Sequence, residues 1–104
     1  MHNGVVYLTG QVPHESTFGA GAGKQTESVL AAIDSLLKRS GSDRTRLLNA
    51  QVFLTDLRDF DAMNEAYVKW LPAGGAPCRT TIGVAALANP SWKVEITVTA
   101  ATKA

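Results

Sequence analysis

The sequence carries one arginine and one glutamate in two consecutive apolar segments near its end, and these are its best candidates for chemistry. Arg79 opens the segment 79–86, shortly after Pro77, and Glu95 lies within the segment 92–100. Alternate residues of a strand share one face, so pairing of the two segments would place both side chains on the same polar face. Because a guanidinium holds a carboxylate through two parallel hydrogen bonds, this predicts a site for a small carboxylate. A simple ion pair between Arg79 and Glu95 is the alternative.

Two segments with helical periodicity and four with alternating apolar residues must position this pair. Apolar residues in 25–38 recur at the spacing of one helix face. Asp59 is a candidate N-cap for a second helix, which Pro72 and the glycines at 74 and 75 would end. This order of elements predicts an α+β fold in which two helices pack on one face of a mixed β-sheet. The predicted strands cover residues 5–9, 47–55, 79–86 and 92–100.

The sheet face turned away from the helices is predicted to be mildly polar. Alternation turns Leu48 toward the helices with Ala50, Val52 and Leu54, and in the segment 79–86 it turns Ile82 the same way. The other face suits burial against further copies of the chain, which predicts a closed homo-oligomer. An ordinary half-solvated antiparallel sheet explains the pattern equally well. The residues expected on this polar face are Asn49, Gln51, Phe53, Arg79, Thr81, Glu95, Thr97 and Thr99.

Composition narrows the class of protein. The 104 residues, 45% of them hydrophobic and 18% charged, suit a single domain over residues 1–104, and we expect no membrane partner. A net charge of +1 provides no field to gather nucleic acid, so we expect no nucleic-acid partner. Two histidines and one cysteine without a ligand motif argue against a bound metal. The single cysteine and the lack of a secretory leader favour a cytoplasmic location.

Two other signals are weaker. The run 19–24 is similar to a phosphate-binding loop, but Phe18 and Gln25 stand where such a loop requires a glycine and a serine or threonine. We therefore interpret the run as a flexible entry to the first helix. Cys78 neighbours Arg79 and so points to the other face of the strand, where we expect it to pack in the core rather than act as a nucleophile.

Short fragments spread over nearly the whole chain share their order and spacing with one protein family. They are residues 6–11 (VYLTGQ), 52–56 (VFLTD), 59–60 (DF), 63–64 (MN), 76–79 (APCR) and 94–96 (VEI). Each fragment is weak alone, but the ordered set resembles the Rid family, also called the YjgF/YER057c/UK114 family, of small trimeric imine and enamine deaminases. Residues 89–96 are most similar to a bacterial subgroup related to the YoaB proteins.

The resemblance implies a chorismate-mutase-like α+β domain that forms a homotrimer, with ligand clefts between neighbouring subunits. By residue match, Arg79 corresponds to the arginine that binds the substrate carboxylate, and Glu95 to the glutamate that orients or activates water near the imine carbon. Gly10 matches the glycine whose backbone amide approaches the ligand. The matches to residues that line or support the cleft are Tyr7, Asn64 and Thr81.

The activity that the resemblance implies is hydrolysis of a small 2-imino acid, or its enamine tautomer, to a 2-keto acid and ammonia without a cofactor. A non-catalytic trimer that binds small carboxylates or partner proteins is the alternative, because a fold does not determine activity. Two features depart from the family pattern. Thr81 stands where the best-known deaminases often have cysteine. The family's upstream segment, with its aromatic residue, has no match here, which implies a more open cleft, a partner's segment or a start further upstream.

Overall fold

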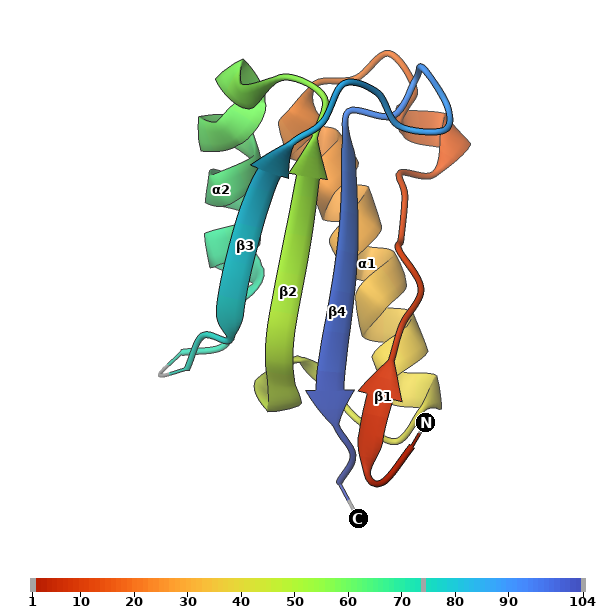
Figure 1. Cartoon of the computed structure of the whole chain (residues 1–104), viewed down its shortest axis with the longest axis vertical. Coiled ribbons are helices and arrows are strands. Elements are labelled where there is room, and N and C mark those ends of the chain that lie inside the picture. The colour runs from red at the N-terminus through yellow and green to blue at the C-terminus, as the bar shows by residue number, and fades with distance from the viewer. Residues whose placement is uncertain (1, 74, 104) are drawn as a thin grey trace.

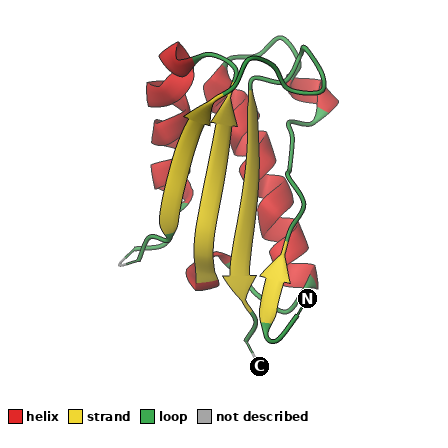
Figure 2. Ribbon diagram, viewed as in Figure 1, coloured by secondary structure: helices red, strands yellow, loops and turns green. Residues whose placement is uncertain are grey.

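A computed structural model shows the arrangement of residues 2–73 and 75–103, so Gly74, expected after the second helix, lies outside the described residues. The described residues form two layers, a four-stranded sheet and two helices (Figure 1). The strands are β1 (Val5–Tyr7), β2 (Leu47–Leu54), β3 (Cys78–Gly83) and β4 (Val94–Ala101), and the helices are α1 (Ala22–Arg39) and α2 (Phe60–Trp70). Both helices lie on the same side of the sheet (Figure 2), which confirms the predicted fold class. The side without helices is called the open face below.

The order of the strands in the sheet is β1-β4-β2-β3. β2 is parallel to β3 and antiparallel to β4, and β4 is antiparallel to β1. A parallel neighbour requires a crossover connection, which α2 provides between β2 and β3. The prediction that the last two strands of the chain could pair is therefore wrong, because β2 lies between them.

The apolar core lies between the sheet and the helices. β4 and β2, the two central strands of the sheet, turn alternate residues toward the helices. Each helix buries one apolar face against these residues. The connections described by the structure contain three short 3-10 helices, Glu15–Thr17 (η1), Arg44–Arg46 (η2) and Leu57–Asp59 (η3). The fully or almost fully buried core residues are Val6 in β1, Val29, Leu30, Ile33 and Leu37 in α1, Met63, Tyr67 and Trp70 in α2, Ala50, Val52 and Leu54 in β2, and Val94, Ile96, Val98 and Ala100 in β4.

A β-bulge near the start of β2 corrects one prediction. Leu47 aligns with Ala100 and Asn49 with Thr99, so Leu48 is an extra residue in β2. Leu47 packs against the core, whereas Leu48 is 48% exposed. Simple alternation predicted that Leu48 faces the helices, because a strict period of two takes no account of an inserted residue. Beyond the bulge the alternation of β2 holds as predicted.

Gln25 joins three segments at the start of α1. Its side chain is fully buried, and its Nε2 donates to the carbonyl oxygens of Thr17 at 3.3 Å and Ser91 at 2.9 Å. Its Oε1 accepts from the backbone N–H of Lys93 at 2.7 Å. The loop before α1 and the turn before β4 are thereby held against the same helix. Buried amides are tolerated when their donors and acceptors are used in this way.

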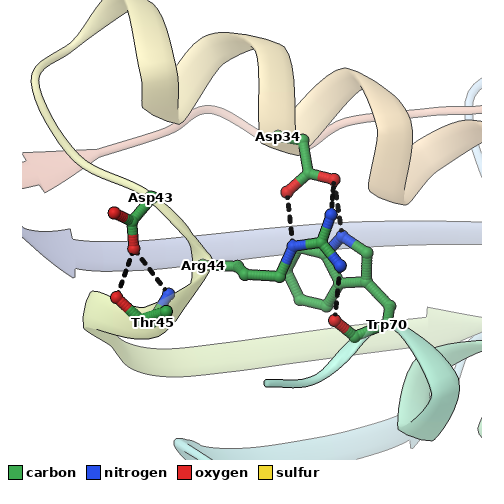
Figure 3. A network of polar contacts seen from close by, with 5 residues as sticks. All are labelled: Asp34, Asp43, Arg44, Thr45 and Trp70. Atoms are coloured by element: carbon green, nitrogen blue, oxygen red, sulfur yellow. Dashed lines mark hydrogen bonds and ion pairs between the residues drawn. The ribbon is translucent and has the colours of Figure 1, made fainter. Parts of the chain in front are cut away.

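A second polar network joins the other ends of the helices (Figure 3). Arg44 donates from Nε and Nη2 to the two carboxylate oxygens of Asp34, at 3.1 and 2.7 Å, and from Nη1 to the carbonyl oxygen of Trp70 at 2.8 Å. The indole Nε1 of Trp70 also donates to Asp34, at 2.9 Å. The central carbon of the Arg44 guanidinium lies 5.3 Å from the centroid of the Trp70 ring. One arginine therefore satisfies a carboxylate of α1 and the last carbonyl of α2.

Replacing Gln25 with leucine is expected to lower the free energy of unfolding by about 2–3 kcal/mol, because the apolar side chain leaves Ser91 O and Lys93 N without these partners. Urea denaturation followed by circular dichroism measures the change. Glu27→Leu, at an exposed position of the same helix, is the control, with an expected change below about 0.5 kcal/mol. Equal effects of the two variants would contradict the role assigned to the Gln25 amide.

Candidate functional site

Arg79 points toward the helices rather than toward the open face. It aligns with Ala50 of β2, and Ala50 aligns with Val98 of β4. Aligned residues of neighbouring strands share a face, and both Ala50 and Val98 are buried beneath the helices. The prediction that Arg79 and Thr81 lie on the polar face is therefore wrong. Ile82, which the pattern turned inward, is 39% exposed on the open face.

α2 supplies the surroundings of Arg79. The Nη1 group of Arg79 donates to Oδ1 of Asn64 at 2.6 Å. The central carbon of the guanidinium lies 4.8 Å from the ring centroid of Tyr67 and 5.6 Å from that of Phe60. Aromatic faces attract a cation placed over them. A charged side chain can therefore turn inward at the edge strand β3, because α2 presents two rings and an amide to it.

The charge of Arg79 has no carboxylate partner among the described residues. The ion pairs found there are Arg44–Asp34, Arg58–Asp56, Lys69–Glu65 and Lys103–Asp43. The predicted alternative of an ion pair between Arg79 and Glu95 is therefore wrong. Burial raises the pKa of Tyr67, and the nearby Arg79 cation opposes this shift, so the phenol is neutral beneath the guanidinium. The buried hydroxyls of Tyr67 and Thr81 have no hydrogen-bond partner within the described residues.

Glu95 lies on the open face, toward the opposite edge of the sheet. It aligns with Phe53, three residues beyond Ala50 in β2 and hence on the other face. After β1 the chain continues along β4, where Gln11 and Ile96 exchange backbone hydrogen bonds of 2.8 and 3.0 Å. This brings Gly10 against Glu95, so closely that a Cβ on Gly10 would lie 2.9 Å from Cδ of Glu95.

The six site residues predicted from the sequence form two groups in one chain. The arginine group, on the helix side near the β3 edge, consists of Arg79, Asn64 and Thr81, together with Phe60 and Tyr67. The glutamate group, on the open face near the β1 edge, consists of Glu95, Gly10 and Tyr7; Tyr7 aligns with Thr99 and is 61% exposed. Arg79 and Glu95 are separated by two strand spacings and by three residues along the strands, about 10 Å in each direction. A single chain therefore does not bring them into one site.

The sequence did not indicate two members of the arginine group, and the environment predicted for one neighbouring residue, Cys78, was wrong. In the sequence, Phe60 was noted within the family fragment at 59–60, and Tyr67 was not singled out as a candidate site residue. Asn64 lies one helical turn from each of them, and this polar residue between two aromatic residues is the signal that could have marked the group. Cys78 is exposed instead of packing in the core, because its neighbour Arg79 occupies the helix side.

Other features of the chain lie apart from these two groups. Neither described helix is long and apolar enough to cross a membrane. Residues 2–73 and 75–103 contain no group of three or more His, Cys, Asp or Glu side chains arranged to hold a metal ion. A hollow of about 470 Å³ between α1 and η2 includes no residue of either group. Its lining residues are Asp34, Ser35, Lys38, Arg39, Asp43, Arg44 and Thr45.

Comparisons with known proteins identify the family. Residues 1–102 match the family described as Endoribonuclease L-PSP. The chain is 46% identical to the RutC family protein YoaB of Escherichia coli strain K12 over 101 residues, which are 97% of this chain and 85% of the relative. It is also 38% identical to Reactive Intermediate Deaminase A, chloroplastic, of Arabidopsis thaliana. This match spans 89 residues, which are 82% of this chain and 47% of the relative.

The fold leads to the same class of protein. A crystal structure of a YjgF family member from Neisseria meningitidis is similar with a TM-score of 0.91 and 39% identity, over 98% of this chain and 82% of that chain. The two helices on a mixed four-stranded sheet are thus the YjgF fold. The chain belongs to the endoribonuclease L-PSP family, to which the YjgF and RutC proteins belong, and the resemblance inferred from the sequence is confirmed.

Gly10→Ala is expected to displace the Glu95 carboxylate while changing the free energy of unfolding by less than about 1 kcal/mol. The added Cβ meets the end of a flexible side chain, and Gly10 is not among the glycines with positive φ, so the backbone accepts alanine. A crystal structure of the variant and its thermal unfolding measure the two effects. Gly23→Ala, whose Cβ would lie 3.7 Å from Ala62 O, is the control. An unmoved carboxylate in Gly10→Ala would contradict the close approach.

Proposed function

We propose that the protein is an enamine/imine deaminase, a cofactor-independent hydrolase that converts small 2-imino acids to 2-keto acids and ammonia. The observation that carries the proposal is Arg79, a guanidinium held by Asn64 over two aromatic rings and without a carboxylate partner in the described part of the chain. Such a group is suited to bind the carboxylate of a small substrate. Family membership supports the proposal, because one relative bears the name Reactive Intermediate Deaminase A.

The proposed reaction needs one water molecule and a proton relay. Arg79 anchors the substrate carboxylate through two parallel hydrogen bonds. Glu95 orients a water molecule, whose oxygen bonds to the imine carbon while the nitrogen takes up protons and leaves as ammonia. The backbone amide of Gly10 approaches the ligand, where the absence of a side chain leaves room beside Glu95. Tyr7, Asn64 and Thr81 line or support the cleft. Because imines also hydrolyse in water, positioning and proton transfer are sufficient tasks for the protein.

The opposite placement of Arg79 and Glu95 supports a cleft between two copies of the chain. The arginine group lies near one edge of the sheet and the glutamate group near the other, on opposite faces. A head-to-tail contact brings two different surfaces together and closes into a ring when the rotation permits. We propose a homotrimer in which Arg79 of one copy and Glu95 of the next line each cleft. The exposed Tyr7 and Ile82 of the open face are suited to burial in such an assembly.

Arg79→Ala is expected to lower kcat/KM for 2-iminopropionate at least about 100-fold, because the anchor for the carboxylate is lost. The assay generates the imine in solution and follows its disappearance after protein is added. Arg58→Ala, at an exposed arginine outside both groups, is the control and is expected to retain the wild-type rate. A wild-type rate in Arg79→Ala would remove the role assigned to Arg79. If the wild-type protein itself did not exceed buffer, a carboxylate-binding trimer without catalysis would be the better description.

Mixed oligomers test whether each cleft draws on two copies. Arg79→Ala and Glu95→Gln are expected to be nearly inactive when prepared separately. If equal amounts of the two chains assemble at random in a ring, about a quarter of the clefts combine an intact Arg79 with an intact Glu95 from the next copy. Imine hydrolysis in co-expressed protein is therefore expected to recover to about a quarter of the wild-type rate. Recovery would be absent if both residues of one cleft came from the same chain.

A further inference from the structure

Glu95 has a different neighbour on each of its two sides within the open face. On the side of β1, a Cβ on Gly10 would lie 3.2 Å from Cγ and 2.9 Å from Cδ of Glu95. On the side of β2, Phe53 aligns with Glu95. Aligned residues of antiparallel strands have Cβ atoms about 4.5–5.5 Å apart. The carboxyl end of Glu95 therefore lies against the Gly10 backbone, and the aromatic side chain of Phe53 starts directly beside it on the other side.

Phe53 belongs to a row of residues that crosses three neighbouring strands, β3, β2 and β4 (Figure 1). It aligns with Ile82 as well as with Glu95, so these three side chains lie side by side on the open face. Phe53 is half-buried and Ile82 is exposed. The next row toward the start of β2 consists of the uncharged polar residues Thr80, Gln51 and Thr97. The apolar surface of these two rows is thus formed by Phe53 and Ile82, and it adjoins Glu95.

Tyr7, which is also aromatic and on the open face, lies farther from Glu95. It aligns with Thr99, four residues beyond Glu95 in β4. This separation corresponds to about 13 Å along the strand. Phe53, one strand away and in the same row, is therefore better placed than Tyr7 to contact a molecule that Glu95 holds.

The side chain of the substrate is the group that remains to be placed in the proposed cleft. The imine carbon of a 2-imino acid carries a carboxylate, a nitrogen and a side chain. Arg79 of one copy is proposed to bind the carboxylate, and Glu95 of the next copy to hold water at the imine carbon. The substrate side chain then lies close to the surface beside Glu95, where Phe53 offers an aromatic face. An apolar side chain that covers this face removes apolar surface from water and is favoured there.

We infer that Phe53 is the specificity-determining residue of the proposed cleft, and that the protein acts on 2-imino acids with apolar side chains longer than a methyl group in preference to 2-iminopropionate. This inference rests on the proposed function, in which Glu95 orients the attacking water. It adds the class of substrate. Ile82 extends the same apolar surface toward the β3 edge.

The ratio of two kcat/KM values, for the imines formed in solution from leucine and from alanine, tests the inference. The wild-type ratio is expected to be at least about tenfold in favour of the leucine imine, the discrimination that one or a few methylene groups provide. Phe53→Thr, which keeps a residue suited to a strand, is expected to bring the ratio within about twofold of one. Phe53→Leu keeps an apolar side chain and is expected to retain most of the ratio. Loss of folded protein lowers both rates equally, so a merely structural role leaves the ratio unchanged.

Leu48→Thr is the matched control, because it removes an exposed apolar side chain from the same strand away from Glu95, and its ratio is expected to equal that of wild type. The corresponding 2-keto acids, 4-methyl-2-oxopentanoate and pyruvate, provide a measurement that does not depend on catalysis. Isothermal titration calorimetry is expected to give the lower Kd for 4-methyl-2-oxopentanoate in wild type and nearly equal Kd values in Phe53→Thr.

The inference and the proposed function fail in different ways. Equal acceleration of both imines by the wild-type protein would overturn the inference and leave the proposed function intact. A Phe53→Thr variant that keeps the wild-type preference would do the same. Failure of the proposed function is a wild-type protein that accelerates neither imine over buffer. The inference would still hold in that case if the two Kd values differ and the difference is lost in Phe53→Thr, and it would be overturned if they do not differ.

Discussion

The position of β2 between β3 and β4 is the constraint on which the rest of the structure depends. Arg79 aligns with Ala50 and Glu95 with Phe53, an odd number of residues apart on the same strand, so their side chains must lie on opposite faces. A slip of one residue would not correct this, because it would turn the apolar residues of β2 away from the helices. The backbone therefore divides the candidate site into two groups, and the proposed chemistry requires a second copy of the chain.

α2 has two tasks, and its sequence reflects both. One side of the helix buries Met63 and Trp70 in the core, and the adjoining side presents Phe60, Asn64 and Tyr67 to Arg79. Both Arg44 and Arg79 lie over aromatic rings, but the Arg44 charge is paired with Asp34 and joins elements of the fold, whereas the Arg79 charge has no carboxylate partner among the described residues. A guanidinium placed over an aromatic ring thus stabilises the fold at one end of α2, whereas the one beside the middle of the helix is available for a ligand.

The elements were predicted well because their signals are local. Periodicity indicated both helices and all four strands, although β3 ends at Gly83, where its partner β2 ends at Leu54, rather than at residue 86. The ordered family fragments indicated Arg79, Glu95 and Gly10, and the structure brings Gly10 against Glu95. The main errors concern the pairing of the last two strands and the direction of side chains. The bulge at Leu48 and the outward turn of Cys78 and Ile82 depend on pairing partners that no local pattern contains.

The sequence by itself determined the fold class, the family and the residue types available for chemistry, because apolar spacing and short motifs are properties of neighbouring residues. Only the tertiary structure decided which strands pair, which face of β3 meets the helices and which site residues share a surface. The physical reason is that an edge strand with few apolar side chains has no strong preference of its own for which of its faces turns toward the helices. The rings and amide of α2 make the inward position favourable for the Arg79 cation, and that contact forms only when the crossover packs against the sheet.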